Sequence, residues 1–336
     1  YSGGATCPSL LLEPSRTNLI DYSEYFNLYT TYGSPTITAN AITSPEGVVN
    51  ATKVERGTNS VPLRIGGITT LGTQYTMSLW AKAGTATKIK IEIGDESAPD
   101  YNLTNEWQRF DVTSTPNTYT HIDIEMPLSS NGDYFYIYGL QLEAAASYPT
   151  SYIPTYGVSQ TRARDECVGA GDSSTFNSSE GVLFWEGSIL SNTTIPGAIA
   201  LIGAGSSNRV QFYNLGTSFV TLVQVGGSIV FQTSTGGTID ITTNHKYAVK
   251  WALNDFALWV DGVEIATDTS GATFPNNTLN QLRFSDFGTN YLYANTKQAI
   301  TFNEALSDLD LAILTGATTY NTFAAMALAL NYTVYE

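Results

Sequence analysis

The sequence has little charge and no long hydrophobic run. Charged residues make up 13% of the 336 residues, and 30 Asp and Glu outnumber 15 Lys and Arg, for a formal net charge of −15. Nucleic-acid binding is therefore not expected, because neutralising phosphates requires clustered cations. No apolar run approaches the roughly 18 residues of a membrane-spanning helix, so membrane insertion is not expected either.

Cysteine and histidine are also scarce, with two of each in the chain. Cys7 and Cys167 are too far apart for a zinc motif. They stand near the ends of the first predicted domain, and domain termini often lie close together, so either a disulfide between them or two buried thiols fits the sequence. His121 and His245 stand beside no Ser or Cys in a nucleophile motif, and no phosphate-binding fingerprint occurs.

What the sequence has in abundance is short segments in which apolar and polar residues alternate. This period of two predicts half-buried antiparallel strands. Such segments are 75–93, 107–112, 121–126, 134–142, 182–189, 198–202, 209–213, 219–225 and 247–265. In the last of them, Asp261-Gly262 is typical of a type I′ hairpin turn. Two short helices are predicted near the C-terminus, at 307–315 with a capping-box-like Ser307 and Asp310, and at 322–330.

Many short strands followed by two short helices predict an all-β fold with two β-sandwich domains. We expect a first domain over residues 1–167, a Gly- and Ser-rich linker over 168–179, and a second domain over 180–336 that ends in the helical tail.

The predicted second helix carries an apolar stripe. Its members recur at helical spacing and are Phe323, Met326, Ala327 and Leu330. A helix this short is not stable alone, so the stripe must pack on other residues. Its own sandwich is one candidate. The other is a neighbouring protomer, which would make the chain a homo-oligomer such as a trimer.

Several segments resemble known families. The opening run CPSLLLEPSRTNL at 7–19, the strand at 75–84 and the closing run at 138–155 resemble a module of bacteriophage tail-fibre and other virion structural proteins. That module is similar to the jelly-roll carbohydrate-binding modules. The second half, through 247–251, 256–264 and 306–312, resembles a concanavalin A-like (laminin-G-type) lectin or glucanase sandwich.

The resemblance implies a fold and a function. The fold is a jelly-roll domain followed by a concanavalin A-like domain. The implied function is that of a non-enzymatic adhesion module at a virion surface or in the extracellular space. Its expected partners are a host or environmental polysaccharide, or a cell-surface glycan, together with other virion proteins. A purely architectural virion component, with the sandwiches as spacers, is a further possibility.

Aromatic and polar residues near turns are the candidate ligand-binding residues, because sugar rings stack on aromatic faces. In the first domain the candidates are Tyr101, Trp107, Arg109, Tyr134, Tyr136 and Tyr138. In loops of the second domain they are Asp255, Asp286 and Tyr291. Alternating aromatics in a sandwich are more often core or cross-strand pairs. Trp185, Trp251 and Trp259 are predicted to be mostly core.

His121, Asp123 and Glu125 alternate along one predicted strand and therefore share a face. Retaining glycosidases place two carboxyl groups about 5–5.5 Å apart. A polysaccharide depolymerase or glycanase that uses Asp123 and Glu125 is therefore the alternative function. The other interpretation is a solvated polar face, with the apolar residues between them pointing inward.

Clustered carboxylates could also hold a structural Ca²⁺, which prefers oxygen ligands. Glu92, Asp95 and Glu96 surround a glycine at a strand end. The resemblance to jelly-roll modules, which often bind Ca²⁺ between their terminal strands, implies Glu13 and Glu143 as rival ligands. A solvated acidic loop is the alternative to a metal site.

Overall fold

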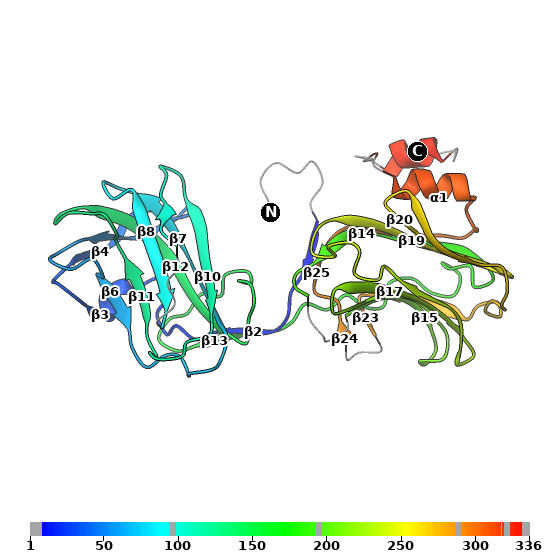
Figure 1. Cartoon of the computed structure of the whole chain (residues 1–336), viewed down its shortest axis with the longest axis horizontal. Coiled ribbons are helices and arrows are strands. Elements are labelled where there is room, and N and C mark those ends of the chain that lie inside the picture. The colour runs from blue at the N-terminus through cyan, green and yellow to red at the C-terminus, as the bar shows by residue number, and fades with distance from the viewer. Residues whose placement is uncertain are drawn as a thin grey trace. The chain divides into compact units, whose positions relative to one another are not determined.

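The computed structural model describes residues 9–94, 99–192, 197–286, 290–316, 318 and 323–330. The predicted all-β class is confirmed: antiparallel sheets form two sandwiches, and the α-helices are two short ones, α1 (Asp308–Thr315) and α2 (Phe323–Ala329). Contacts divide the chain into two compact units, Ser15–Arg164 and Tyr1–Pro14 with Asp165–Glu336 (Figure 1). No helix in the described part is long and apolar enough to cross a membrane.

The division differs from the predicted domains at both ends of the first sandwich. Strand β1 (Leu10–Leu12) pairs with β25 (Ala294–Phe302) of the second sandwich. The predicted linker is also partly built into that sandwich, because Ala170 bridges Leu282 and Phe176 is buried in its core. A three-leucine strand has no alternation to reveal it, and its partner lies almost at the other end of the chain.

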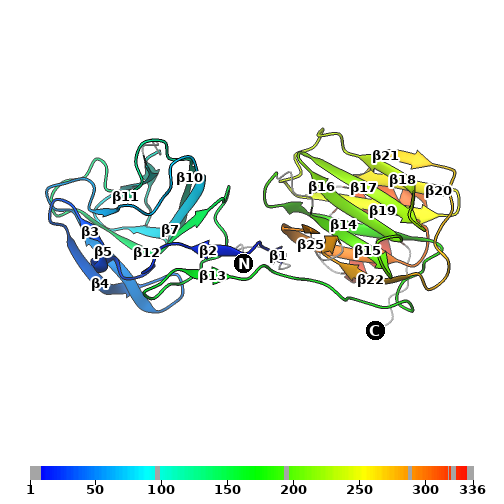
Figure 2. The ribbon, with the colours of Figure 1, turned by 90° about the horizontal axis from the view of Figure 1, so that it is seen from below.

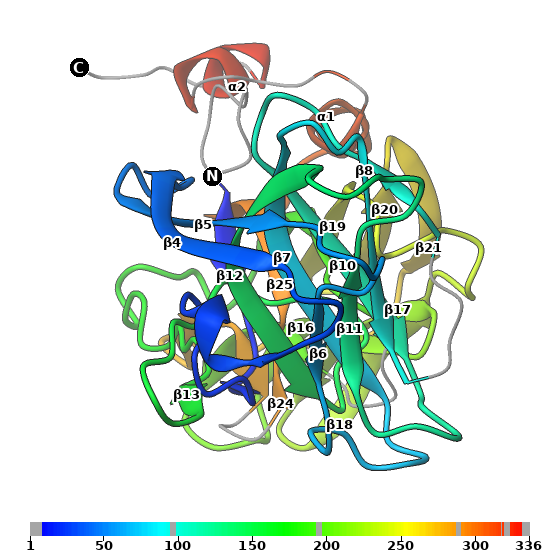
Figure 3. The ribbon, with the colours of Figure 1, turned by 90° about the vertical axis from the view of Figure 1, so that its left-hand side faces the viewer.

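The first sandwich, Ser15–Arg164, has two five-stranded sheets (Figures 2 and 3). One has the order β10 (Gln108–Ser114), β7 (Tyr75–Ala83), β12 (Tyr134–Ala144), β5 (Val49–Glu55), β4 (Thr36–Thr43). The other has the order β3 (Thr30–Thr31), β6 (Leu63–Ile65), β11 (Ile122–Glu125), β8 (Lys88–Ile93), β9 (Tyr101–Asn102). A short ribbon pairs β2 (Arg16–Asn18) with β13 (Gln160–Arg162), and the 3₁₀ helix η1 (Phe26–Leu28) buries Phe26 in the core.

The second sandwich stacks a six-stranded sheet on a seven-stranded one. The first has the order β1, β25, β14 (Gly181–Ile189), β19 (His245–Ala252), β20 (Asp255–Val260), β21 (Val263–Asp268). The second has the order β18 (Ser228–Ser234), β17 (Ser218–Val225), β16 (Arg209–Leu215), β15 (Ala198–Gly203), β24 (Asn290–Tyr291), β23 (Ser285–Asp286), with β22 (Leu279–Arg283) also on β15. Asp261 and Gly262 both have positive φ, 49° and 83°, which confirms the type I′ turn.

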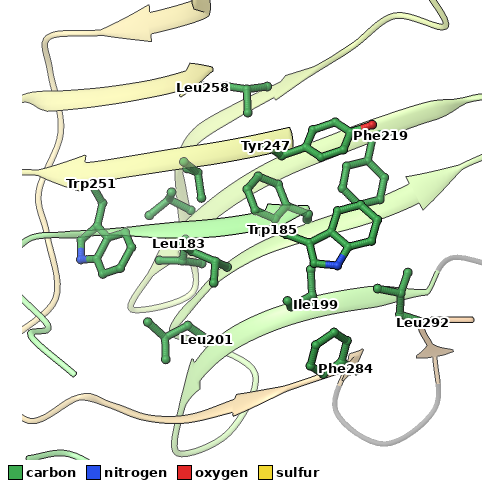
Figure 4. Close-up of a cluster of buried hydrophobic side chains, with 14 of the residues drawn as sticks. Leu183, Trp185, Ile199, Leu201, Phe219, Tyr247, Trp251, Leu258, Phe284 and Leu292 are labelled. Atoms are coloured by element: carbon green, nitrogen blue, oxygen red, sulfur yellow. The ribbon is translucent and has the colours of Figure 1, made fainter. Parts of the chain in front are cut away.

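Aromatic and branched side chains from both sheets fill the second core (Figure 4). Trp185 stacks on Phe219 and Tyr247, with ring centroids 5.1 and 5.5 Å apart. Trp185 and Trp251 are fully buried there, and Trp259 is buried beside the helices, so the core prediction for all three is confirmed. Because successive side chains of a strand point to opposite faces, the residues between these core positions lie on the outer faces of the two sheets.

The two helices cover the outer face of the six-stranded sheet. Helix α1 begins where expected, with the Ser307 side chain accepting a hydrogen bond from the Asp310 N–H. Met326 and Leu330 of the tail are buried in a cluster with Phe184 and Trp259 of this sheet. These contacts favour packing of the stripe on its own sandwich, and packing on a neighbouring protomer stays the alternative. The Phe323 side chain lies outside the described residues, and oligomerisation stays a prediction.

Candidate functional site

The outer face of the seven-stranded sheet carries an open pocket of about 240 Å³. Val210 and Phe212 of β16 point into the core, so the residues between them point to the opposite face. The pocket is lined by Ala198 of β15, Arg209, Gln211 and Tyr213 of β16, Leu222 of β17, Ile229 and Gln232 of β18, Asp286 of β23 and Asn290 of β24.

Gln211 lies in the middle of this face, paired across the strands with Ala200 on one side and Leu222 on the other. Gln211 is only 4% exposed, yet among the described residues its Oε1 has no hydrogen-bond partner. A buried acceptor without a donor costs about 1–3 kcal/mol of folding free energy. Gln211 therefore brings an unsatisfied carboxamide to the pocket lining, and its covered Oε1 would accept from a ligand hydroxyl once the side chain turns toward the pocket.

Polar and apolar groups surround Gln211. Arg209 Nη1 lies 3.3 Å from Asp286 Oδ1, an ion pair that joins β16 to β23. Gln232 Nε2 donates a weak hydrogen bond to the Tyr213 hydroxyl at 3.5 Å. Ile229 adds a half-exposed apolar wall. Donors, acceptors and an apolar surface within one small pocket suit a polyhydroxylated ring better than a purely apolar ligand.

The three ligand-binding residues predicted in the second domain lie at different places in the structure. Asp286 lines the pocket, whereas Tyr291 pairs with Ser285 and Ala198 at its border. Asp255 lies on the other sheet, where its carboxylate is 2.8 Å from the Lys250 ammonium. Asp286 is the one lining residue that the sequence predicted; the polar lining residues Arg209, Gln211 and Gln232 are among those it missed. The signal that could have revealed the first two is the run of large polar residues at alternate positions of β16.

Tyr138 does not present a stacking surface in the first sandwich, contrary to the prediction. It is 1% exposed, and its hydroxyl donates to Glu24 Oε1 at 3.3 Å, as do those of Tyr152 and Tyr156 at 3.2 Å. Burial is the main reason that the pKa values of Tyr138 and Tyr152 are raised. The Tyr138 ring packs against Trp80 and Tyr152, so a ligand cannot reach it.

Arg109 and Tyr101 are engaged in holding the first sandwich together. The Arg109 guanidinium lies 4.7 Å from the Trp80 ring centroid and donates to Ser78 Oγ and the Thr150 carbonyl. The Tyr101 hydroxyl donates to the Asp111 carbonyl at 2.7 Å. Both arrangements favour a structural role over ligand contact.

Trp107, Tyr134 and Tyr136 keep part of their surface exposed. The Trp107 indole N–H donates to the Thr43 carbonyl at 3.0 Å. Tyr134 and Tyr136 meet edge to face, and the Lys53 ammonium lies 4.2 Å from the Tyr134 centroid. Their predicted role in ligand binding stays a prediction.

The candidate glycosidase carboxylates lie in a closed charge network. Glu92, Asp123 and Glu125 bring oxygen atoms within 4.8 Å of one another on β8 and β11. Asp123 is 2% exposed, and both its oxygens accept hydrogen bonds from the Arg64 guanidinium. The Lys90 ammonium pairs with Glu92 and lies 3.9 Å from Glu125.

Burial, followed by the neighbouring Glu92, raises the pKa of Glu125 to about 7, against the opposing effect of Lys90. Asp123 is held by Arg64 and shielded from solvent, so the pair does not form an accessible acid and base. The alternative interpretation of a solvated polar face is also wrong for Asp123, because this side chain is buried.

The predicted Ca²⁺ site stays a prediction. Asp95 lies outside the described residues. Both oxygens of the buried Glu143 carboxylate accept hydrogen bonds from Thr150, at 3.0 and 2.5 Å, and the buried Glu13 belongs to the other compact unit. Glu92, Asp123 and Glu125 are the grouping found among the described residues, and Arg64 and Lys90 already neutralise much of its charge. That donor set suits a cation poorly.

Only one member of the predicted disulfide can be placed. Cys167 is half-buried against the second core, and burial raises the pKa of its thiol. Cys7 lies outside the described residues, so the pairing stays a prediction.

No family model matches the chain, and no curated protein does. Solved structures with partial likeness include the Ruminococcus gnavus IT-sialidase CBM40 bound to α2,3-sialyllactose, at 15% identity over 45% of this chain and 96% of that one, TM-score 0.36. The match to a Limulus polyphemus SAP-like pentraxin covers 43% of this chain and 73% of the pentraxin chain, at 11% identity and a TM-score of 0.34. The match to sheep galectin-11 covers 41% of this chain and 98% of the galectin chain, at 11% identity and a TM-score of 0.29. Likeness at this level assigns no ligand to this chain.

Proposed function

We propose that the chain is a non-enzymatic glycan-binding module and that the pocket on the seven-stranded sheet binds one sugar residue. The single observation that carries the proposal is the buried Gln211 carboxamide, whose Oε1 lacks a donor inside a pocket with other hydrogen-bonding groups. Its volume of about 240 Å³ lies just below the roughly 300–1,000 Å³ of pockets for drug-sized ligands, which suits one ring of a longer chain.

The proposed setting is a virion appendage that contacts a host or environmental polysaccharide. This part rests on the resemblance of segments 7–19 and 138–155 to phage structural proteins. Partner virion proteins and a virion-surface or extracellular location belong to the same proposal.

The alternative glycanase has less support. Its candidate residues are Asp123, which is shielded and paired with Arg64, and Glu125 in the same network. Incubation with laminarin, alginate and host capsule, followed by a reducing-end assay, is expected to yield no product. Product that disappears in Glu125→Gln would establish the alternative instead.

The test of the binding proposal is a glycan array followed by titration calorimetry on the full chain. Replacing Gln211 by Leu removes the acceptor at similar volume, and at least about tenfold weaker binding is expected. Gln298→Leu, on the six-stranded sheet, is the matched control and should bind as the unmodified chain does. Failure of the unmodified chain to bind any glycan would leave the architectural role as the better interpretation.

A further inference from the structure

The charge of the second unit is distributed unevenly. The unit of residues 1–14 and 165–336 contains 5 basic and 16 acidic residues, a formal charge of −11. The strands of the seven-stranded sheet contain only Arg209, Arg283 and Asp286 among these, a charge of +1. The strands of the sheet that bears the pocket therefore carry a net positive charge within a strongly acidic unit.

The two arginines differ in their partners. Arg209 is paired with Asp286 at 3.3 Å across the pocket wall. Arg283 donates from Nε to Ser285 Oγ at 2.9 Å, and within the described residues its guanidinium has no carboxylate partner. Although the unit has 16 acidic residues, the half-buried Arg283 guanidinium has none of their carboxylates beside it among the described residues, so its positive charge is unbalanced.

Arg283 stands beside the pocket. Ala200 is the cross-strand partner of both Arg283 on β22 and Gln211 on β16, so these two side chains flank a single methyl group on one face. Asp286, three residues after Arg283, lines the pocket itself. Ala200 is itself fully buried, so an anionic group on a ring at Gln211 is reached by extension of the long Arg283 side chain from the neighbouring strand rather than across an open surface.

We infer that the pocket selects an acidic sugar residue, one that carries a single carboxylate or sulfate, with Arg283 as the residue that sets this specificity. The inference rests on the proposed function and adds the charge class of the ligand. One negative charge on the ligand would bring the sheet from +1 to neutrality. Arginine suits this role because its planar guanidinium can donate two parallel hydrogen bonds to a carboxylate or sulfate.

The probes are three size-matched galactan oligosaccharides, one neutral, one with C6 carboxylates (oligogalacturonate) and one sulfated. A second series compares gluco-oligosaccharides with the same chains oxidised to carboxylates at C6. Calorimetry on the full chain should show at least about tenfold tighter binding of an anionic member than of its neutral counterpart. That preference should weaken as salt rises. The carboxylated and sulfated arms identify which anion is recognised.

Arg283→Gln should reduce the anionic preference to within about threefold while leaving the affinity for the neutral chain unchanged. The matched control is Lys82→Gln in the other unit, which removes the same charge and should keep the preference. A merely structural role for Arg283 would weaken all ligands together, which would overturn the inference.

The two proposals fail in different ways. If a neutral chain binds as well as its anionic counterpart, and Gln211→Leu abolishes that binding, the charge class is wrong and the proposed function stands. If the unmodified chain binds no member of either series and no glycan on the array, the proposed function fails as well.

Discussion

Two polar surfaces of this chain differ in how far their groups are satisfied. In the first sandwich, Arg64 of β6 neutralises Asp123 of the neighbouring β11, and Lys90 neutralises Glu92 within β8. In the pocket of the second sandwich, Gln211 is similarly buried, but its acceptor has no partner in the part of the chain that the structure describes. A closed network stabilises its own fold, whereas an unsatisfied buried group needs something from outside. The second surface is for that reason the better candidate for binding.

The largest expected effect comes from opening the closed network. Asp123→Ala leaves the Arg64 guanidinium without its carboxylate. Because the Arg64 side chain is about a third exposed, we expect the low end of the cost of breaking a buried pair, about 3 kcal/mol of unfolding free energy. Hydrogen exchange of β11 amides in the full chain would measure this within the first sandwich. The control is Asp100→Ala, which removes the ion-pair partner of Lys88. Because Asp100 is more exposed than Asp123, this change should alter the free energy of unfolding by under about 1 kcal/mol. Equal effects would show that the network is no more than a surface ion pair.

The next effect tests where the C-terminal stripe packs. Met326→Ala removes a buried side chain from the cluster on the six-stranded sheet and should cost about 2–4 kcal/mol of unfolding free energy in chemical denaturation. Leu328→Ala changes an exposed neighbour in the same helix and should cost less than about 0.5 kcal/mol. If Met326→Ala changed the oligomeric state by light scattering without changing stability, the stripe would contact a neighbouring protomer after all.

The sequence supported the fold better than the site. Alternation within single segments predicted many of the strands but not β1, β4, β5, β18 or β25. Turn and capping residues predicted the Asp261-Gly262 turn and the α1 cap, because each depends on neighbouring residues. The site depends on which strands lie beside each other, and no local pattern shows that Ala200 separates Gln211 from Arg283. Aromatic content was misleading for the same reason: Tyr138 faces outward from its sheet, and Tyr152 and Glu24 then cover it.

A smaller effect concerns the pH dependence of the closed network. Glu125 has a pKa of about 7 in the folded chain, against 4.5 ordinarily, so the folded state holds more protons than the unfolded state between these values. Stability should therefore fall as pH rises from about 4.5 to 7, by on the order of 1–3 kcal/mol. Glu125→Gln should flatten this dependence in denaturation curves, whereas Glu106→Gln, at an exposed position, should retain it. An unchanged slope in Glu125→Gln would assign the titration to another group.

The smallest expected effect has the opposite sign and bears most directly on the comparison. Gln211→Leu replaces an unsatisfied buried carboxamide with an apolar side chain of similar size, beside Ala200 and Leu222. The unbound chain should become more stable by about 1 kcal/mol, because the desolvated acceptor is gone. Thermal unfolding without ligand measures this, and Gln298→Leu on the other sheet should show no such gain. A residue whose removal stabilises the fold and weakens glycan binding is retained for its ligand. If Gln211→Leu were instead destabilising, Gln211 would have a partner within the folded chain, and the pocket would be as closed as the network around Asp123.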